Sequence, residues 1–227
     1  MGDWRIRVVS VRHSSALLFD LDGTLTDPYE GIASCLRFAM ERMGRPLAAD
    51  AECRRYIGPP IQSVFGALCG TDDESTIAAA VGFYRERFGP TGLYENRVYP
   101  GVPAMLERLA RDRVLYVCTS KPAVYASRIV AHFELGGFFR AVYGSELDGA
   151  RTDKAHLIAW LLEREGLAAR TTAMIGDREH DAIGARANGV TPYGVLWGYG
   201  SEDELRTAGI AGAFATPADV VRHFAGD

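Results

Sequence analysis

The second half of the chain alternates between short apolar runs and stretches with helical spacing. Residues 114–118, 141–143, 172–175 and 192–196 are predicted strands. Between them, apolar residues recur at the three- and four-residue intervals of a helix. Strands that are apolar throughout and separated by helices are typical of a parallel sheet covered on both faces. The sequence therefore predicts an α/β fold built on a parallel, Rossmann-like sheet.

The first half of the chain has a different pattern. One apolar run, residues 16–19, predicts a further strand, and helices are expected near 28–43, 61–68 and 77–88. No strand-like run of β-branched residues interrupts this block before about residue 96. We expect a core domain of residues 1–25 and 98–227, whose first crossover carries an inserted small all-helical domain, residues 26–97. The connections near 26–27 and 98–101 are the expected hinge.

Two aspartates follow the apolar run at residues 16–19. Asp20 and Asp22 are two positions apart, so in extended backbone their carboxylates project to the same side. Gly23 then allows a sharp turn in which the backbone can approach a ligand closely. Repulsion between the carboxylates makes this arrangement costly unless a cation binds. The alternative is a surface turn, because Asp and Gly are ordinary turn residues.

Other predicted strand ends also carry polar residues, and ligands of such sheets bind beyond the carboxyl ends of the strands. Thr119 and Ser120 follow the strand at 114–118, where they either hold a phosphate oxygen or simply cap the next helix. Asp177 ends another strand, and Asp181 follows one helical turn later. The aspartates form an oxygen-only set that suits Mg²⁺.

Lys154 begins a predicted helix, where the helix dipole disfavours a cation. We expect it to neutralise a bound phosphate and the nearby carboxylates; a solvated surface lysine is the alternative. His180 lies between Asp177 and Asp181 in sequence and is expected to face away from the site.

Composition limits the class of protein. A hydrophobic content of 48% supports a core, and the net charge of −4 without a basic run argues against nucleic acid binding. No apolar stretch reaches the length of a membrane span. The four cysteines lack the close spacing of a zinc site or disulfide framework. We expect a reduced, cytoplasmic protein with no nucleic acid or membrane partner.

Together these motifs resemble those of the haloacid dehalogenase-like (HAD-like) hydrolases over nearly the whole chain. The resemblance rests on Asp20-Leu21-Asp22-Gly23-Thr24, Thr119, Lys154 and Gly176-Asp177-x-x-x-Asp181. The helical insertion is similar to the cap that follows the first motif in this family. The chain looks most like the phosphoglycolate phosphatase and bacterial 5′-nucleotidase branch, through the stretches 119–122, 176–178 and 194–200.

The resemblance implies a mechanism. Asp20 attacks phosphorus and forms an aspartyl-phosphate, and Asp22 protonates the leaving alcohol and later deprotonates water. The cofactor is Mg²⁺, held by Asp20, Asp177 and the backbone carbonyl of Asp22, while Asp181 positions the metal shell or Lys154. The implied catalytic set is completed by Thr119 and Lys154. The implied phosphate contacts are Gly23, Thr24, Thr119, Ser120 and Lys154.

A rigid Gly-Pro-Pro turn at residues 58–60 interrupts the helical block. In relatives with this cap the equivalent loop faces the active site. Contacts to the leaving group are therefore expected from Tyr56, Ile57, Gly58 and Gln62. A plain helix–helix connection is the alternative.

The sequence thus predicts a Mg²⁺-dependent phosphatase of small phosphorylated metabolites, with nucleoside 5′-monophosphate and 2-phosphoglycolate as the leading substrates. The alternatives are a sugar phosphate phosphotransferase or mutase, and a non-catalytic domain that binds a phosphorylated ligand. The last predicts a lost nucleophile, acid or metal ligand, and none is lost. The chain is expected to be a monomer or homodimer. Residues 1–15 form either an edge strand or a loose tail.

Overall fold

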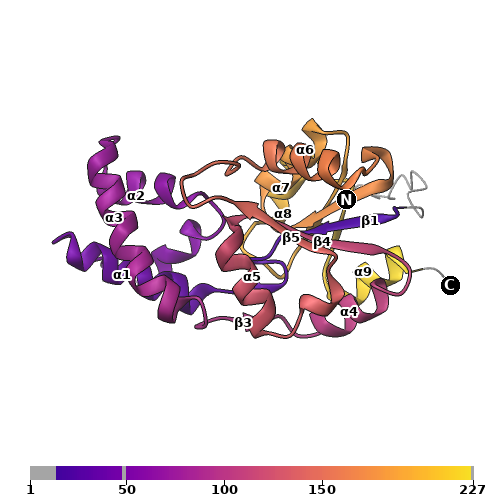
Figure 1. Cartoon of the computed structure of the whole chain (residues 1–227), viewed down its shortest axis with the longest axis horizontal. Helices are drawn as coiled ribbons and strands as arrows, with labels where there is room; N and C mark the ends of the chain where they lie inside the picture. Colours follow the sequence, from indigo (N-terminus) through magenta and orange to yellow (C-terminus); the bar gives the residue numbers. More distant parts are fainter. Residues whose placement is uncertain (1–13, 48–49, 226–227) are drawn as a thin grey trace, which may run out of the picture.

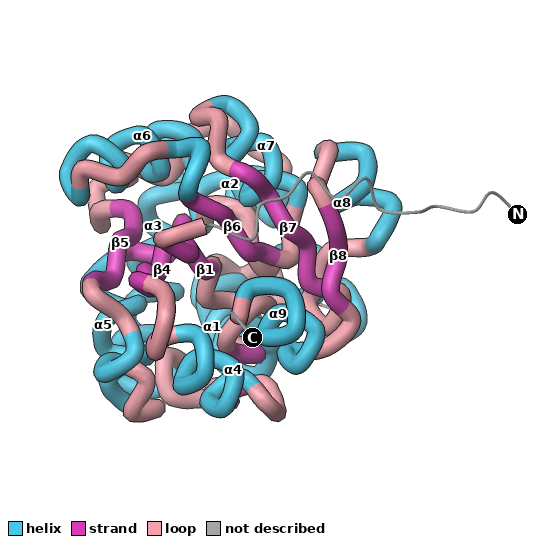
Figure 2. The backbone as a smooth tube through the Cα atoms, turned by 90° about the vertical axis from the view of Figure 1, so that its right-hand side faces the viewer, coloured by secondary structure: helices cyan, strands magenta, loops and turns pink. Residues whose placement is uncertain are grey.

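A six-stranded parallel sheet forms the centre of the protein, in a computed structural model that describes residues 14–47 and 50–225. The strand order is β5-β4-β1-β6-β7-β8, and every neighbouring pair is parallel (Figure 2). The predicted α/β fold is confirmed. The strands are β1 (Ala16–Phe19), β4 (Val114–Pro122), β5 (Ala141–Ser145), β6 (Thr172–Gly176), β7 (Thr191–Val195) and β8 (Gly212–Phe214).

Helices cover both faces of the sheet, which explains why the strands are apolar throughout. In β1, Leu17 and Phe19 pack into one hydrophobic cluster, whereas Ala16 and Leu18 pack into another. Figure 2 shows the two layers of helices above and below the sheet. One layer holds α6 (Lys154–Glu165), α7 (Glu179–Ala187) and α8 (Glu202–Ala208), and the other holds α4 (Val102–Leu109), α5 (Ala123–His132) and α9 (Pro217–Phe224).

A helical segment interrupts the connection from β1 to β4, as predicted. It starts and ends at a two-stranded antiparallel ribbon of β2 (Thr26–Asp27) and β3 (Arg97–Val98). In Figure 1 its helices lie on one side of the molecule and the sheet on the other. The segment contains α1 (Tyr29–Arg42), a 3₁₀ helix (Asp50–Tyr56), α2 (Ile61–Cys69), α3 (Glu74–Arg87) and a π-helical turn (Phe88–Gly92). We call residues 26–97 the cap; this division into domains and the hinge at the ribbon remain proposals.

Two parts of the fold differ from the sequence prediction. β4 ends at Pro122 rather than at Cys118, because its backbone stays extended beside β5, where the Ser145 hydroxyl donates to the carbonyl of Ser120 at 2.8 Å. Helix α5 therefore begins at Ala123, with Pro122 as its N-cap. The elements after β7 (α8, β8 and α9) were not predicted. The questions about residues 1–13 lie outside the described residues.

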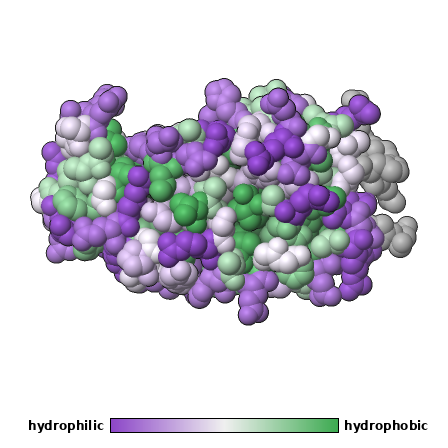
Figure 3. Space-filling model, in the orientation of Figure 1, coloured by the Kyte–Doolittle hydropathy of each residue, from purple (hydrophilic) through white to green (hydrophobic). Residues whose placement is uncertain are grey.

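Three further properties of the described residues bear on the expected class of protein. Within residues 14–47 and 50–225, no helix combines the length and apolar character that crossing a membrane requires. On the face shown in Figure 3, hydrophilic residues frame the patches of hydrophobic ones. All four cysteines are buried as thiols.

Close packing inside the cap allows a stability prediction with a matched pair of variants. A Cβ at Gly31 of α1 would overlap the carbonyl oxygen of Gly92, whereas one at Gly82 of α3 would meet no heavy atom of the described residues within 4 Å. Gly31→Ala should lower the free energy of unfolding by about 1–3 kcal/mol through overpacking. Gly82→Ala should raise it by about 0.5–1 kcal/mol through helix propensity. Urea unfolding of both variants checks this, and equal stabilities would contradict the packing of α1 against the π-helical turn.

Candidate active site

Three carboxylates converge at the carboxyl ends of β1 and β6. Asp20 follows β1, Asp177 follows β6, and Asp181 lies in the first turn of α7. The two strands are hydrogen-bonded neighbours, and the backbone N–H of Asp20 donates to the carbonyl of Ile175 at 2.9 Å. One oxygen from each of the three carboxylates lies within 4.8 Å of the others, and all three residues are buried. The fold therefore brings these predicted site residues together.

Lys154 lies at the centre of this cluster. Its Nζ is 2.9 Å from Oδ1 of Asp20 and 2.6 Å from Oδ1 of Asp181, and it donates to the carbonyl of Cys118 at 2.9 Å. Only 4% of the side chain is exposed, so it is not a solvated surface lysine. Burial alone would lower the pKa of Lys154, but the charges of Asp181 and Asp20 raise it above its ordinary value. The lysine is therefore charged in its unfavourable place at the start of α6.

The cluster still has an excess of negative charge. Burial raises the pKa of Asp177 well above its ordinary value, and the charges of Asp20 and Asp181 raise it further. Burial also raises the pKa of Asp181, against the opposing effect of Lys154. A divalent cation among these oxygens would compensate the excess charge. Since all the donors are oxygens, the residues fit Mg²⁺.

Asp177 is held in place by the turns around it. It accepts hydrogen bonds from the Thr24 hydroxyl at 3.2 Å and from the backbone N–H of Tyr199 at 2.8 Å. A Cβ at Gly23 (φ +84°) or at Gly198 would overlap the Asp177 side chain. These glycines thus allow a close approach of backbone to a buried carboxylate.

The structure gives Gly23 and Thr24 a different role from the phosphate contacts expected of them. The Thr24 hydroxyl is used by Asp177, and the backbone N–H of Gly23 donates to the carbonyl of Thr26 at 2.8 Å. Neither residue lines the cavity described below. Both act on the site by fixing the position of Asp177.

Asp22 forms an ion pair with Lys121 that the sequence motifs did not predict. Its Oδ2 lies 2.7 Å from Nζ of Lys121, and the two side chains are 11% and 7% exposed. Its Oδ1 is buried without a hydrogen-bond partner among the described residues. Burial raises the pKa of Asp22, while Lys121 opposes the rise. The composition could have indicated this role. Of the 25 lysines and arginines in the chain, the two lysines are Lys121 and Lys154, and both pair with aspartates of the site.

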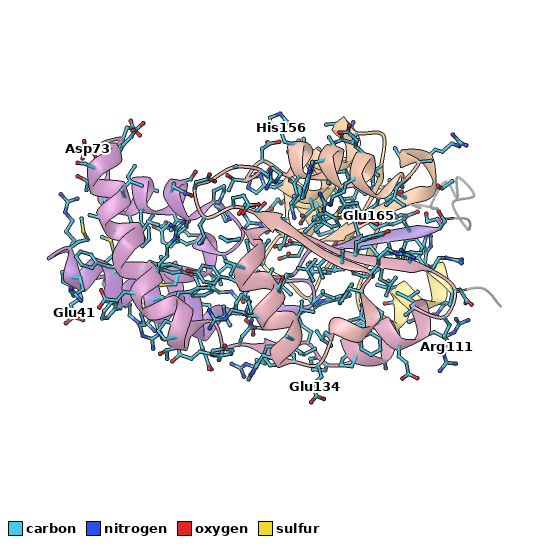
Figure 4. The ribbon with its side chains drawn as sticks, viewed as in Figure 1. Glu41, Asp73, Arg111, Glu134, His156 and Glu165 are labelled. Carbon is cyan, nitrogen blue, oxygen red and sulfur yellow. The ribbon has the colours of Figure 1, made fainter. Side chains whose placement is uncertain are left out.

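One cavity connects these groups with the cap. Among the predicted core residues, it is lined by Asp20, Asp22, Thr119, Ser120, Lys154 and Asp181. The cap contributes the predicted Tyr56, Gly58 and Gln62, together with aromatic residues that include Tyr84 and Phe88. Elsewhere, the exposed carboxylates of Glu41, Asp73 and Glu134 point away from the molecule (Figure 4).

Two residues lie differently from their predicted positions. The side chain of Ile57 is 1% exposed, packs into the hydrophobic core and does not line the cavity. Its backbone carbonyl accepts a hydrogen bond from Arg178 of the core. His180 borders the cavity instead of facing away from it, because the first turn of α7 lies beside the strand ends. Sequence spacing could not reveal this orientation.

A parallel α/β sheet with a buried aspartate–lysine cluster at its strand ends is the arrangement that the motifs predicted for a hydrolase of this class. The profile of the haloacid dehalogenase-like hydrolase family matches residues 17–195. The chain belongs to this family, as its motifs predicted, and the comparisons place it among the family's phosphatases.

Three similar proteins illustrate this relationship. The chain is 54% identical over 191 residues to a 5′-nucleotidase of Pseudomonas aeruginosa, covering 84% of this chain and 86% of that one. It is 35% identical over 189 residues to the tyrosine-protein kinase PtkA of Mycobacterium tuberculosis, covering 82% of this chain and 64% of that one. The crystal structure of a predicted phosphatase from Clostridium acetobutylicum superposes with a TM-score of 0.88 at 35% identity, covering 92% and 97% of the two chains.

Proposed function

We propose that this protein is a Mg²⁺-dependent phosphatase that hydrolyses small phosphomonoesters through a phosphorylated Asp20. The observation that carries the proposal is the buried pairing of Asp20 with Lys154 beside Asp177 and Asp181. The alternative of a plain surface turn at Asp20 does not explain why a cation and three carboxylates are buried together at the carboxyl ends of β1 and β6. A cytoplasmic location is also proposed, in keeping with the buried thiols.

The proposed reaction has two steps. In the first, a carboxylate oxygen of Asp20 bonds to phosphorus as the bond from phosphorus to the leaving oxygen breaks. Asp22 gives a proton to that oxygen, and an alcohol leaves. In the second, water attacks phosphorus and loses a proton to Asp22, which releases phosphate and restores Asp20. The cavity contacts of Thr119 and Ser120 support their role in binding the phosphoryl oxygens.

The metal would be held by Asp20, Asp177 and the backbone carbonyl of Asp22. When bound, it supplies positive charge to the phosphoryl oxygens and to the carboxylates. We assign Asp181 to positioning, since its Oδ1 pairs with Lys154 at 2.6 Å and its Oδ2 accepts from the backbone N–H of Arg178 at 3.3 Å. Lys154 balances the charges of Asp20 and the substrate.

The cap side of the cavity favours a nucleoside 5′-monophosphate over 2-phosphoglycolate. Tyr56, Tyr84 and Phe88 offer aromatic surface, and Gln62 offers an amide. The carboxylate of phosphoglycolate needs a cation instead. Of the lysines and arginines that line the cavity, Lys121 and Lys154 pair with carboxylates of the site, Arg178 pairs with Glu204, and Arg85 donates to the carbonyl of Leu147. An aromatic wall suits a nucleobase.

A second candidate is phosphoryl transfer to a hydroxyl acceptor, as in a kinase or a sugar phosphate mutase. The similarity to PtkA, which is named as a tyrosine-protein kinase, supports this candidate. It needs the same Asp20 chemistry but requires an acceptor hydroxyl to replace water at the phosphorylated aspartate. A non-catalytic binding domain is not favoured, because nucleophile, acid and candidate metal ligands are all present and close together.

A phosphate-release assay with and without Mg²⁺ tests the proposal. The panel should include nucleoside 5′-monophosphates, 2-phosphoglycolate, sugar phosphates, pyridoxal phosphate and a phosphotyrosine peptide. We expect release that falls by about two orders of magnitude or more in EDTA, with nucleotides as the best substrates. Substrate consumption with the phosphate recovered on a second alcohol would instead establish the transferase. No reaction with any substrate in Mg²⁺ would contradict both enzymatic functions.

A further inference from the structure

We propose that Lys121 is a positioning residue that orients the Asp22 carboxylate toward the leaving group of the substrate. The inference rests on the proposed function, because it assumes that Asp22 protonates the leaving oxygen. It assigns a role to the second lysine of the chain, which the mechanism above does not use.

The two oxygens of the Asp22 carboxylate differ in their surroundings. Oδ2 is held by Nζ of Lys121 at 2.7 Å, while Oδ1 is buried without a partner among the described residues. A buried unpaired carboxylate oxygen is costly, so its persistence points to a ligand group that completes it. Since Asp22 lines the cavity, the leaving oxygen of a bound phosphomonoester is the group available to Oδ1.

Lys121 itself has little conformational freedom, because both its backbone and its ammonium group have partners. It lies on the extended end of β4, and its backbone N–H donates to the Thr119 hydroxyl at 3.3 Å. Its Nζ lies 4.9 Å from the ring centroid of Phe88 in the cap, which is the geometry of a cation–π contact. A side chain fixed at both ends can hold a carboxylate in one orientation.

Lysine is a rare residue in this chain. This chain uses arginine for all but two of its 25 lysines and arginines, and both lysines pair with carboxylates of the site. An ammonium is a compact point charge, whereas a guanidinium is a broad fork that would engage both carboxylate oxygens. Lysine therefore leaves Oδ1 of Asp22 available, which a bidentate arginine would not.

The role of Lys121 belongs to the first step. As Asp20 bonds to phosphorus, the electron pair of the breaking phosphorus–oxygen bond remains on the leaving oxygen, which takes its proton from Oδ1 of Asp22. Lys121 keeps its contact with Oδ2 throughout and transfers nothing. Its removal should therefore impair only the reactions that need a proton on the leaving group.

Two substrates with different leaving groups make the test specific. Lys121→Met should lower kcat/KM by about 100-fold for the best nucleoside monophosphate, the lower range for a general acid. For 4-nitrophenyl phosphate, whose phenolate leaves without a proton, the loss should stay below about 10-fold. kcat/KM is the relevant quantity because it reports on phosphorylation of the enzyme and excludes the later attack of water. Asp22→Asn should show the same selectivity.

Control variants separate this role from a structural one. Arg222→Met removes an exposed cation of α9, 76% exposed, and should leave both substrates unaffected. Lys121→Arg keeps the charge and should fall between the wild type and Lys121→Met. If Lys121→Met does not fold, Lys121→Gln, which keeps a donor, replaces it in the same comparison.

The outcomes distinguish this inference from the proposed function. Wild-type hydrolysis of both substrates, lost in Asp20→Asn, supports the phosphatase whatever Lys121 does. Equal losses for both substrates in the Lys121 variants would overturn the inference and assign Lys121 to phosphate binding or to the fold. Unchanged rates for both would overturn it as well.

Discussion

Asp20→Asn should reduce phosphate release by about 10⁴-fold or more, because a carboxamide cannot replace the attacking carboxylate. The effect should appear in kcat with every substrate that the wild type accepts, since all share the first step. The folded structure should survive, because Asn keeps the size of the side chain and an oxygen for the contact with Lys154, which is 2.9 Å from Oδ1 of Asp20.

The matched control is Asp72→Asn, which makes the same chemical change at an exposed residue of the cap. It should retain wild-type activity. Urea unfolding of both variants should accompany the kinetics, so that a loss of activity is distinguished from a loss of the fold. A loss of less than about 10-fold in Asp20→Asn would argue against Asp20 as the nucleophile.

Lys154→Met should impair both stability and activity. The lysine is the cation between Asp20 and Asp181, and its side chain is 4% exposed. Removing one partner of a buried ion pair leaves uncompensated charge and costs about 3–5 kcal/mol. We expect a loss of that size in the free energy of urea unfolding, measured in EDTA so that no metal compensates the carboxylates. The activity in Mg²⁺ should fall by about 10²–10³-fold.

A double variant tests the cause of the instability. In Lys154→Met/Asp181→Asn one of the two carboxylates is neutral, so the repulsion that the single variant creates is smaller. The double variant should therefore regain part of the lost stability but none of the activity. If it is less stable than Lys154→Met, uncompensated charge is not the cause of the instability, and the hydrogen bond that Asp181 accepts from the backbone N–H of Arg178 contributes more to stability than relief of the repulsion.

The sequence was most informative where the chemistry is local. Asp20 and Asp22 follow a strand that is buried on both faces, and the strand pattern alone indicated that their side chains would lie at its carboxyl end. Lys154 could be singled out because a cation is unfavourable at a helix start. The structure has it buried between two carboxylates.

Features that depend on distant parts of the chain could not be predicted. Tyr199 and Gly198 pack against Asp177 from a loop that no local pattern relates to it. The carbonyl of Ile57 meets Arg178 across the cavity, which required the relative placement of the cap loop and α7. For β8, a three-residue strand, the apolar run was too short to distinguish from a turn.

Trapping of the phosphorylated enzyme tests the central claim most directly. The wild type should be mixed with the best substrate in Mg²⁺, quenched in acid and reduced with borohydride, which converts an acyl phosphate to an alcohol. Peptide mass spectrometry should then find homoserine at position 20 in the wild type and none there in Asp20→Asn. Phosphate release without any modification of Asp20, or with modification of another residue, would contradict the proposed mechanism.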